Sequence, residues 1–396
     1  MKVNDILDSA DFEKELIEIR RTIHENPCVS EHEEETVKYL ASKLEEYGIP
    51  YEVILDGCSI VAVLEGGKPG PVVGVRADID ALPIQEETGL PFASKKAGIM
   101  HACGHDAHAA ILMGTAKVLA SVKEELQGTV KFFFQPAEES IGGAERMIEA
   151  GCLENPHVDY VLGLHVSPAY RCGQIAVKYG KACAASDMID IRIKGTSCHG
   201  AHPDKGVDAI IIAANILNTI QTVISRRVAP EESAVVSFGK IEGGTVRNQI
   251  ADTVTLNGII RTLDPQQRIF VRESVKSIAQ SVAAAMGGEA EVIVMESYGP
   301  LINDDAVVEV AEKNAIRLLG SENVIRQEHP NLGTEDFAYF ALERPSCFFN
   351  LGCYNEELGE RADLHNSRFT IDEGCLKTGT ALQVKNVISL LNGEAK

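Results

Sequence analysis

The segment HDAHAAILMGTAKVLASV, residues 105–122, lies between two apolar runs, PVVGVRADID at residues 71–80 and GTVKFFFQP at residues 128–136. Alanine, isoleucine, leucine and valine recur within the segment at helical spacing, which predicts a buried helix. The two flanking runs have the length and composition of buried strands. Because strand, helix and strand follow in this order, the stretch predicts a parallel sheet covered by helices.

The same alternation continues on both sides of this stretch. Ser30 and Glu33 form a capping box at the start of a predicted helix, which Gly48 ends. Further elements follow downstream: a helix at residues 142–151, a strand at 158–166, a helix at 304–320, a strand at 346–352 and a last helix. Together these elements predict a three-layer α/β domain with a mostly parallel sheet.

The pattern changes near residue 185. The elements from there follow the order β-α-β-β-α-β, at residues 186–195, 206–224, 233–244, 252–263, 265–287 and 289–297. This order is typical of a compact ferredoxin-like α+β unit. We therefore predict a discontinuous catalytic domain of residues 1–184 and 298–396, into which a lid or dimerisation domain of residues 185–297 is inserted.

Composition limits the classes of partner. The formal net charge of −21 disfavours binding to nucleic acid and to anionic membrane surfaces. The beginning of the chain, MKVNDILDSADFEKELIEIRR, lacks the apolar core of a signal peptide. No apolar run approaches the roughly 18 residues of a membrane helix. The ten cysteines include no CxxC pair and indicate free thiols. We expect a cytoplasmic protein with no nucleic-acid or membrane partner.

Ionisable side chains come directly after three of the predicted strands. Asp78 and Asp80 end the first strand, Glu138 and Glu139 follow the second, and His165 ends the third. The carboxyl ends of parallel strands meet at one edge of the sheet, so these groups should lie close together. So many ionisable groups beside apolar strands would be costly unless something compensates their charge.

A divalent transition metal would provide this compensation. Cys103 and His105 lie at the start of the predicted helix, beside the same edge of the sheet. A donor set of cysteine, histidine and glutamate suits Zn²⁺, Co²⁺, Ni²⁺ or Mn²⁺ better than Mg²⁺ or Ca²⁺, which prefer oxygen alone. We expect His101 and His108 to support or cap rather than bind metal, and Asp106 could cap the helix.

Eight short blocks resemble one enzyme family. They are RADIDALPI, MHACGHDAHAA, FQPAEES, GLHV, SCHGAHP, GGTVRNQIAD, GTEDFAYF and LHNSRF, in this order along nearly the whole chain. They resemble the signature blocks of the aminoacylase and carboxypeptidase-G type of metallopeptidase. The similarity is greatest to its N-acyl-amino-acid amidohydrolase branch, which includes hippurate hydrolases and plant auxin-conjugate hydrolases.

This resemblance implies two divalent transition-metal ions per subunit, of Mn, Zn, Co or Ni. The implied metal ligands are Cys103, His105, Glu139, His165 and His365. Glu138 matches the general base, and His199 matches a histidine that stabilises the oxyanion. Asn248 and Arg261 match positions that hold the carboxylate of the substrate. The family also implies a homodimer or homotetramer, in which a partner's inserted domain can complete the site.

The implied reaction is hydrolysis of an N-acyl-L-amino acid to a carboxylic acid and the free amino acid. Metal lowers the pKa of a bound water toward about 7, and a glutamate takes its proton. A dipeptidase or carboxypeptidase using the same centre is a second candidate, although these branches usually have aspartate in place of Cys103. The residues are also compatible with an amidase that uses a cysteine nucleophile and with a non-catalytic binding protein.

Overall fold

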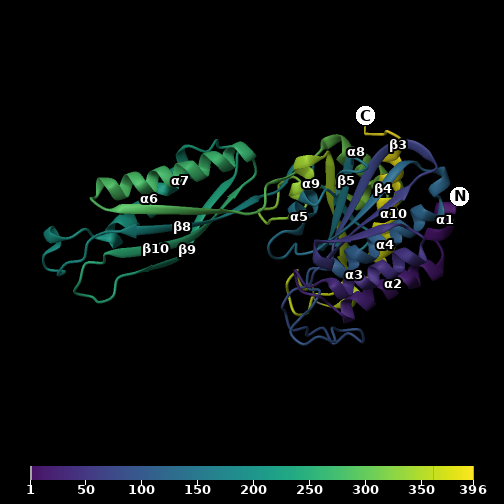
Figure 1. Ribbon diagram of the computed structural model, residues 1–396, viewed down its shortest axis with the longest axis horizontal. Coiled ribbons are helices and arrows are strands. Elements are labelled where there is room, and N and C mark those ends of the chain that lie inside the picture. Colours follow the sequence, from purple (N-terminus) through teal and green to yellow (C-terminus); the bar gives the residue numbers. More distant parts are fainter. Residues whose placement is uncertain (1, 360, 396) are drawn as a thin grey trace. The chain divides into compact units, whose positions relative to one another are not determined.

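The computed structural model describes residues 2–359 and 361–395, which form two compact units. The first unit comprises Met1–Gly180, Ile302–His329 and Asp336–Lys396. The second comprises Lys181–Leu301 and Pro330–Glu335. Figure 1 shows the elements of both units coloured along the sequence.

The first unit is built on an eight-stranded sheet with the order β1-β2-β4-β3-β5-β14-β6-β13. Its strands are β1 Tyr51–Ile54, β2 Ser59–Glu65, β3 Lys68–Asp78, β4 Gln127–Gln135, β5 Tyr160–Arg171, β6 Ile175–Val177, β13 Val324–Arg326 and β14 Ser346–Tyr354. The central strands β4, β3, β5 and β14 are parallel, and β1, β2 and β6 add antiparallel pairs. The predicted α/β class with a mostly parallel sheet is confirmed.

Helices cover both faces of this sheet. They are α1 Lys2–Leu7, α2 Ala10–Glu25, α3 Glu34–Glu46, α4 His105–Ser121, α5 Gly143–Glu149, α8 Asp305–Leu319, α9 Ala338–Glu343 and α10 Gly374–Leu391. Side chains alternate along β4, so Phe132 and Phe134 join the core that contains α4, whereas Phe133 stacks on Phe340 of α9. The three layers follow from this alternation.

Helix α4 lies in the centre of the unit and packs against α2, α10 and β3. Every residue from 105 to 116 is buried, so the helix is enclosed on all sides rather than along one stripe. This burial explains why the helix contains so many small and branched apolar residues.

The second unit contains the predicted β-α-β-β-α-β order. Its elements are β8 Ala185–Lys194, α6 Ala209–Arg226, β9 Ala234–Gly243, β10 Thr253–Thr262, α7 Pro265–Ala285 and β11 Glu289–Glu296. The antiparallel sheet has the order β11-β8-β10-β9, and α6 and α7 pack together on it. A short sheet pairs β7, Gly180–Cys183, with β12, Leu301–Asn303.

One helix of the second unit corrects the expectation about apolar runs. By length and composition alone, α6 could cross a membrane. In the structure Ile212, Ile216 and Ile220 of α6 are buried in the hydrophobic core of this unit. One face of the helix therefore belongs to this core, whereas Ile210 and Ile211 are about half exposed.

The predicted capping box at Ser30 and Glu33 is wrong. Helix α3 begins at Glu34 without a side-chain cap, and the Ser30 hydroxyl donates to Asp80 Oδ2 at 2.7 Å. The Glu33 side chain instead accepts the backbone N–H of Ala137 at 2.9 Å. Both side chains therefore have partners that are distant in sequence, and these contacts replace the local cap.

Asp106 does not cap α4 either. Gly104 occupies the cap position, and Asp106 is buried beside Arg20 and His24 of α2. Its Oδ2 atom accepts from Arg20 Nε at 2.9 Å and lies 2.8 Å from His24 Nδ1. Asp106 thus pairs with two side chains of α2, and these buried contacts hold α2 against α4.

Candidate metal centre

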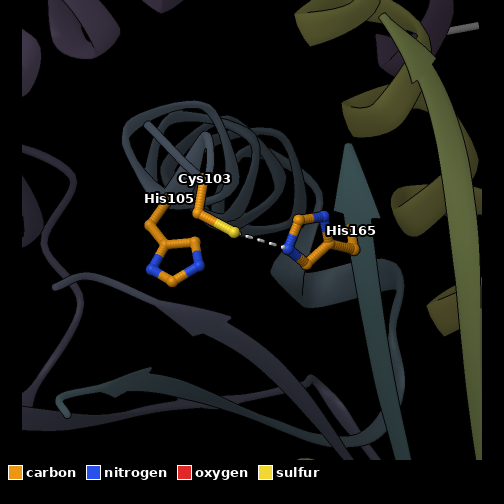
Figure 2. Close-up of side chains that lie close together, drawn as sticks. All are labelled: Cys103, His105 and His165. Carbon is orange, nitrogen blue, oxygen red and sulfur yellow. Dashed lines mark hydrogen bonds between the residues drawn. The ribbon is translucent and has the colours of Figure 1, made fainter. Parts of the chain in front are cut away.

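Three side chains from two adjacent elements form one side of the candidate centre (Figure 2). Cys103 and His105 lie at the start of α4, and His165 lies on β5. The Sγ atom of Cys103 lies 3.3 Å from Nε2 of His165. Cys103 and His105 are buried and His165 is half-buried, so these groups lie largely out of water.

Gly104 allows Cys103 and His105 to face the same point. Its φ angle is 83°, in the left-handed region, and a Cβ atom there would lie 2.4 Å from Cγ2 of Val166. Glycine has no Cβ atom and adopts this conformation at little cost. The tight start of α4 therefore packs directly against the strand that holds His165.

Glu139 and His365 form the other side of the centre. Oε1 of Glu139 lies 3.1 Å from Nε2 of His365 and 3.8 Å from Nε2 of His105. His365 has a φ angle of 63°, and its backbone N–H donates to the carbonyl of Ala102 at 2.8 Å. Left-handed conformations are uncommon for histidine and persist where surrounding contacts fix them.

The donor atoms fit a divalent transition metal. One donor atom each from Cys103, His105 and His165 lie within 4.8 Å of one another, as do those from Cys103, Glu139 and His365. The two groups share Cys103. Nε2 of His105 is buried and has no hydrogen-bond partner among the described residues. Such an atom is costly to bury unless something else, such as a cation, pairs with it.

The ionisation of this cluster also favours a cation. Burial raises the pKa of the Cys103 thiol well above its usual value. Burial alone would lower the pKa of His105, but the Asp78 carboxylate raises it well above normal. A divalent ion binds the deprotonated thiol and the neutral imidazole, so metal binding would release protons here.

Asp80 orients two of the predicted ligands. The Nδ1 atom of His105 lies 2.9 Å from the carbonyl oxygen of Asp80, which directs Nε2 toward the cluster. Oδ2 of Asp80 accepts the backbone N–H of Glu139 at 3.0 Å. Outer contacts of this kind fix the tautomer and the orientation of metal ligands.

Of the other two histidines of the HACGHDAH block, His108 has partners for both ring nitrogens. Nδ1 of His108 lies 2.5 Å from Asp78 Oδ1, and its Nε2 accepts the backbone N–H of Val166 at 2.8 Å. His101 is buried and caps nothing, because neither ring nitrogen has a partner among the described residues. Burial lowers the pKa of His101 to about 4 and keeps its ring neutral.

Glu138 lies beside the predicted ligands. Its side chain is 9% exposed, and one of its carboxylate oxygens lies within 4.8 Å of donor atoms of His105 and Glu139. It follows β4 in the loop before α5. The structure thus brings together Glu138 and all five predicted ligands in the first unit.

The other three predicted residues lie in the second unit. His199 and Asn248 are exposed neighbours, because the N–H of Gly200 donates to the carbonyl of Asn248 at 2.8 Å. Arg261 lies near the end of β10 and donates to the Ser186 hydroxyl. About 25 Å of strand separates Thr253, at the beginning of β10, from Arg261. The unit therefore does not bring Arg261 together with Asn248.

Sequence reasoning missed two buried charges beneath the centre. Arg76 of β3 donates to Asp78 Oδ2 and to Asp336 Oδ1, each at 2.7 Å. Asp336 is fully buried and lies in the GTEDFAYF block, whose pattern by itself indicates no role for this residue. An arginine within an apolar strand was the available signal, because a buried charge requires partners.

A sheet edge that gathers thiol, imidazole and carboxylate donors around a buried glutamate defines a metal-dependent hydrolase. The chain belongs to the peptidase family M20/M25/M40, whose model matches residues 74–387. The family resemblance seen in the sequence is thereby confirmed.

Named relatives act on two kinds of substrate. Thermostable carboxypeptidase 2 of Saccharolobus solfataricus is 37% identical over 98% of both chains. N-acetylcysteine deacetylase of Bacillus subtilis is 39% identical over 92% of this chain and 94% of its own. The crystal structure of the Bacillus subtilis YXEP protein, a dinuclear metal-binding peptidase, matches with a TM-score of 0.85 and 35% identity, over 97% of this chain and 99% of its own.

Proposed function

We propose that this hydrolase cleaves the amide bond of N-acyl-L-amino acids and releases a carboxylic acid and the free amino acid. The supporting observation is the shared Cys103 of the two donor groups, beside the buried Glu138. The deacetylase relative acts on such a substrate by its name. The carboxypeptidase relative supports a second candidate, hydrolysis of peptides at the same centre.

In this proposal Cys103, His105, Glu139, His165 and His365 hold two divalent ions of Mn, Zn, Co or Ni. When bound, the metal supplies a water of lowered pKa and polarises the amide carbonyl. Glu138 would take a proton from the attacking water as its oxygen adds to the amide carbonyl carbon, and would give that proton to the amine nitrogen as the C–N bond breaks. Asp80 keeps His105 and Glu139 in place during these steps.

A hydrolysis panel tests the substrate class. The purified protein is assayed with acetyl-, benzoyl-, long-chain-acyl- and indoleacetyl-amino acids and with dipeptides, in Mn²⁺, Zn²⁺, Co²⁺ and Ni²⁺ separately. We expect turnover of one or more N-acyl amino acids to exceed that of dipeptides. Faster hydrolysis of dipeptides would favour the peptidase candidate, and no hydrolysis of any amide would contradict both.

We further propose that residues 185–297 form an inserted lid or dimerisation domain on a catalytic domain of residues 1–184 and 298–396. His199 would stabilise the oxyanion, and Asn248 and Arg261 would hold the substrate carboxylate. Asn248 and Arg261 lie far apart within one unit, so contact of both with one substrate requires two copies of the chain. We therefore propose a homodimer or homotetramer.

All ten cysteines are free, which favours a cytoplasmic location.

Mixed dimers test this arrangement. Glu138→Gln and His199→Ala proteins should each be nearly inactive alone. After the two are unfolded and refolded together, we expect activity to return to roughly a quarter of wild type, since half of the dimers are hybrids with one intact site each. Refolded single variants are the control. Absence of recovery, with hybrids verified by mass spectrometry, would place His199 and Glu138 of one site in the same chain.

A further inference from the structure

The two glutamates of the centre lie on a short loop whose backbone is unusual. This loop, residues 136–142, connects β4 to α5. Ala137 has a φ angle of 55°, although it is not glycine, and its carbonyl accepts the N–H of Gly142 at 3.0 Å. A left-handed alanine is disfavoured unless other contacts fix it. The orientation of Glu138, the next residue, depends on this conformation.

Three buried carboxylates accept the backbone N–H groups of this loop and its continuation. Asp80 Oδ2 accepts from Glu139 at 3.0 Å. Asp336 Oδ2 accepts from Gly143 at 2.9 Å and from Ala144 at 3.1 Å, where α5 begins. Glu33 Oε1 accepts from Ala137 at 2.9 Å. The three acids come from distant parts of the sequence and hold the beginning, middle and end of the segment.

Glu33 differs from the other two acids. Its side chain is fully buried, and among the described residues it forms no ion pair. Oε1 also accepts the N–H of Glu31 at 3.0 Å, and Glu31 has a φ angle of 68°. One carboxylate oxygen thus holds two left-handed residues on two separate loops. Oε2 of Glu33 has no hydrogen-bond partner among the described residues. Burying this second oxygen therefore has a desolvation cost that no hydrogen bond offsets.

We propose that Glu33 is a positioning residue, whose hydrogen bond to the left-handed Ala137 fixes Glu138 and Glu139 in their working orientation. The inference rests on the proposed function for its catalytic consequence, although the hydrogen bond does not. This role explains why an acid is buried here without a cation. A side-chain oxygen is needed to accept a backbone N–H, whereas the negative charge is not needed. Burial and the neighbouring Asp80 raise the pKa of Glu33 to about 7, which agrees with a minor role for the charge.

Two substitutions separate the hydrogen bond from the charge. Glu33→Gln keeps a side-chain oxygen at the same reach and removes the charge. Glu33→Asp keeps the charge and withdraws the oxygen by one methylene group, beyond reach of the Ala137 N–H. We expect kcat of Glu33→Asp to fall about 10- to 100-fold, since small misplacement of a reacting group has effects of this size. Glu33→Gln should keep near-wild-type kcat, and Glu34→Ala, on the exposed side of α3, is the matched control.

Hydrogen exchange without added metal provides a readout that is independent of activity. In Glu33→Asp we expect faster exchange confined to peptides that cover residues 29–33 and 135–144, with other core peptides unchanged. Glu33→Gln should keep the wild-type protection. Equal loss in both variants, or wild-type kcat and protection in Glu33→Asp, would overturn the inference. If the wild type hydrolyses no amide, the proposed function fails, and the exchange pattern still decides the role of Glu33.

Discussion

Replacing Glu138 with glutamine should lower kcat by about 10²- to 10⁴-fold, the usual contribution of a general base. Glu138 is nearly buried beside His105 and Glu139, and in our proposal it moves the proton between water and the leaving amine. Glutamine has the same shape but cannot take that proton. Metal content should not change, because the proposed ligands are other residues. Steady-state kinetics on the best substrate of the panel, with metal content by mass spectrometry, make the measurement.

Two neighbouring variants make this result specific. Glu139→Gln removes a proposed ligand and should lose both metal and activity. Glu145→Gln, at an exposed position of α5, should have neither effect. Activity of Glu138→Gln close to wild type would remove the assigned base, and loss of metal from it would mean that Glu138 and Glu139 have been assigned in the wrong order.

Much of the fold could be predicted because its periodic patterns have a direct physical cause. The apolar run of α4 reflects burial on all sides, and the alternation along β8 reflects one covered face. Local caps were less predictable. Ser30 and Asp106 have side chains that suit helix termini, yet both pair with buried groups far away in the sequence. A capping pattern in the sequence cannot show that a stronger distant partner exists.

The residues of the site also differ in how far the sequence could predict their positions. Cys103, Glu139 and His165 could be placed together because parallel strands bring their carboxyl ends to one edge. His365 follows no strand, and only the family resemblance pointed to it. Its place depends on a left-handed backbone bonded to Ala102, which no sequence period indicates. The support from Glu33 depends on a similar feature at Ala137.

The separation of Arg261 from Asn248 could not be read from the sequence either. The two residues are 13 positions apart, and either a turn or a strand could join them. Because β10 pairs without interruption with β8 from Thr253 to Thr262, they lie toward opposite ends of the sheet. If both residues contact one substrate, two copies of the chain must contribute to each active site.

Removing the metal should abolish activity altogether. After dialysis against a chelator, with metal absence verified by mass spectrometry, we expect no hydrolysis of any panel substrate. Adding back Mn²⁺, Zn²⁺, Co²⁺ or Ni²⁺ singly should restore activity with the ions that suit the site. The same ions should stabilise the fold, by about 2.7 kcal/mol at a free concentration one hundred times Kd, which a rise in Tm would report. The Glu138→Gln protein is the matched control, because it should gain the same stability on metal binding without gaining activity.

This experiment also decides between the metal centre and a cysteine nucleophile. Sγ of Cys103 lies 3.3 Å from Nε2 of His165, which is also the arrangement of a thiol and its base. Without metal, however, burial raises the pKa of that thiol, so the reactive thiolate is disfavoured. Hydrolysis that persists in verified metal-free protein and is stopped by a thiol alkylating reagent would establish the nucleophile instead. Loss of activity that metal alone reverses would assign Cys103 to the metal, since a thiol enzyme needs no ion to attack an amide.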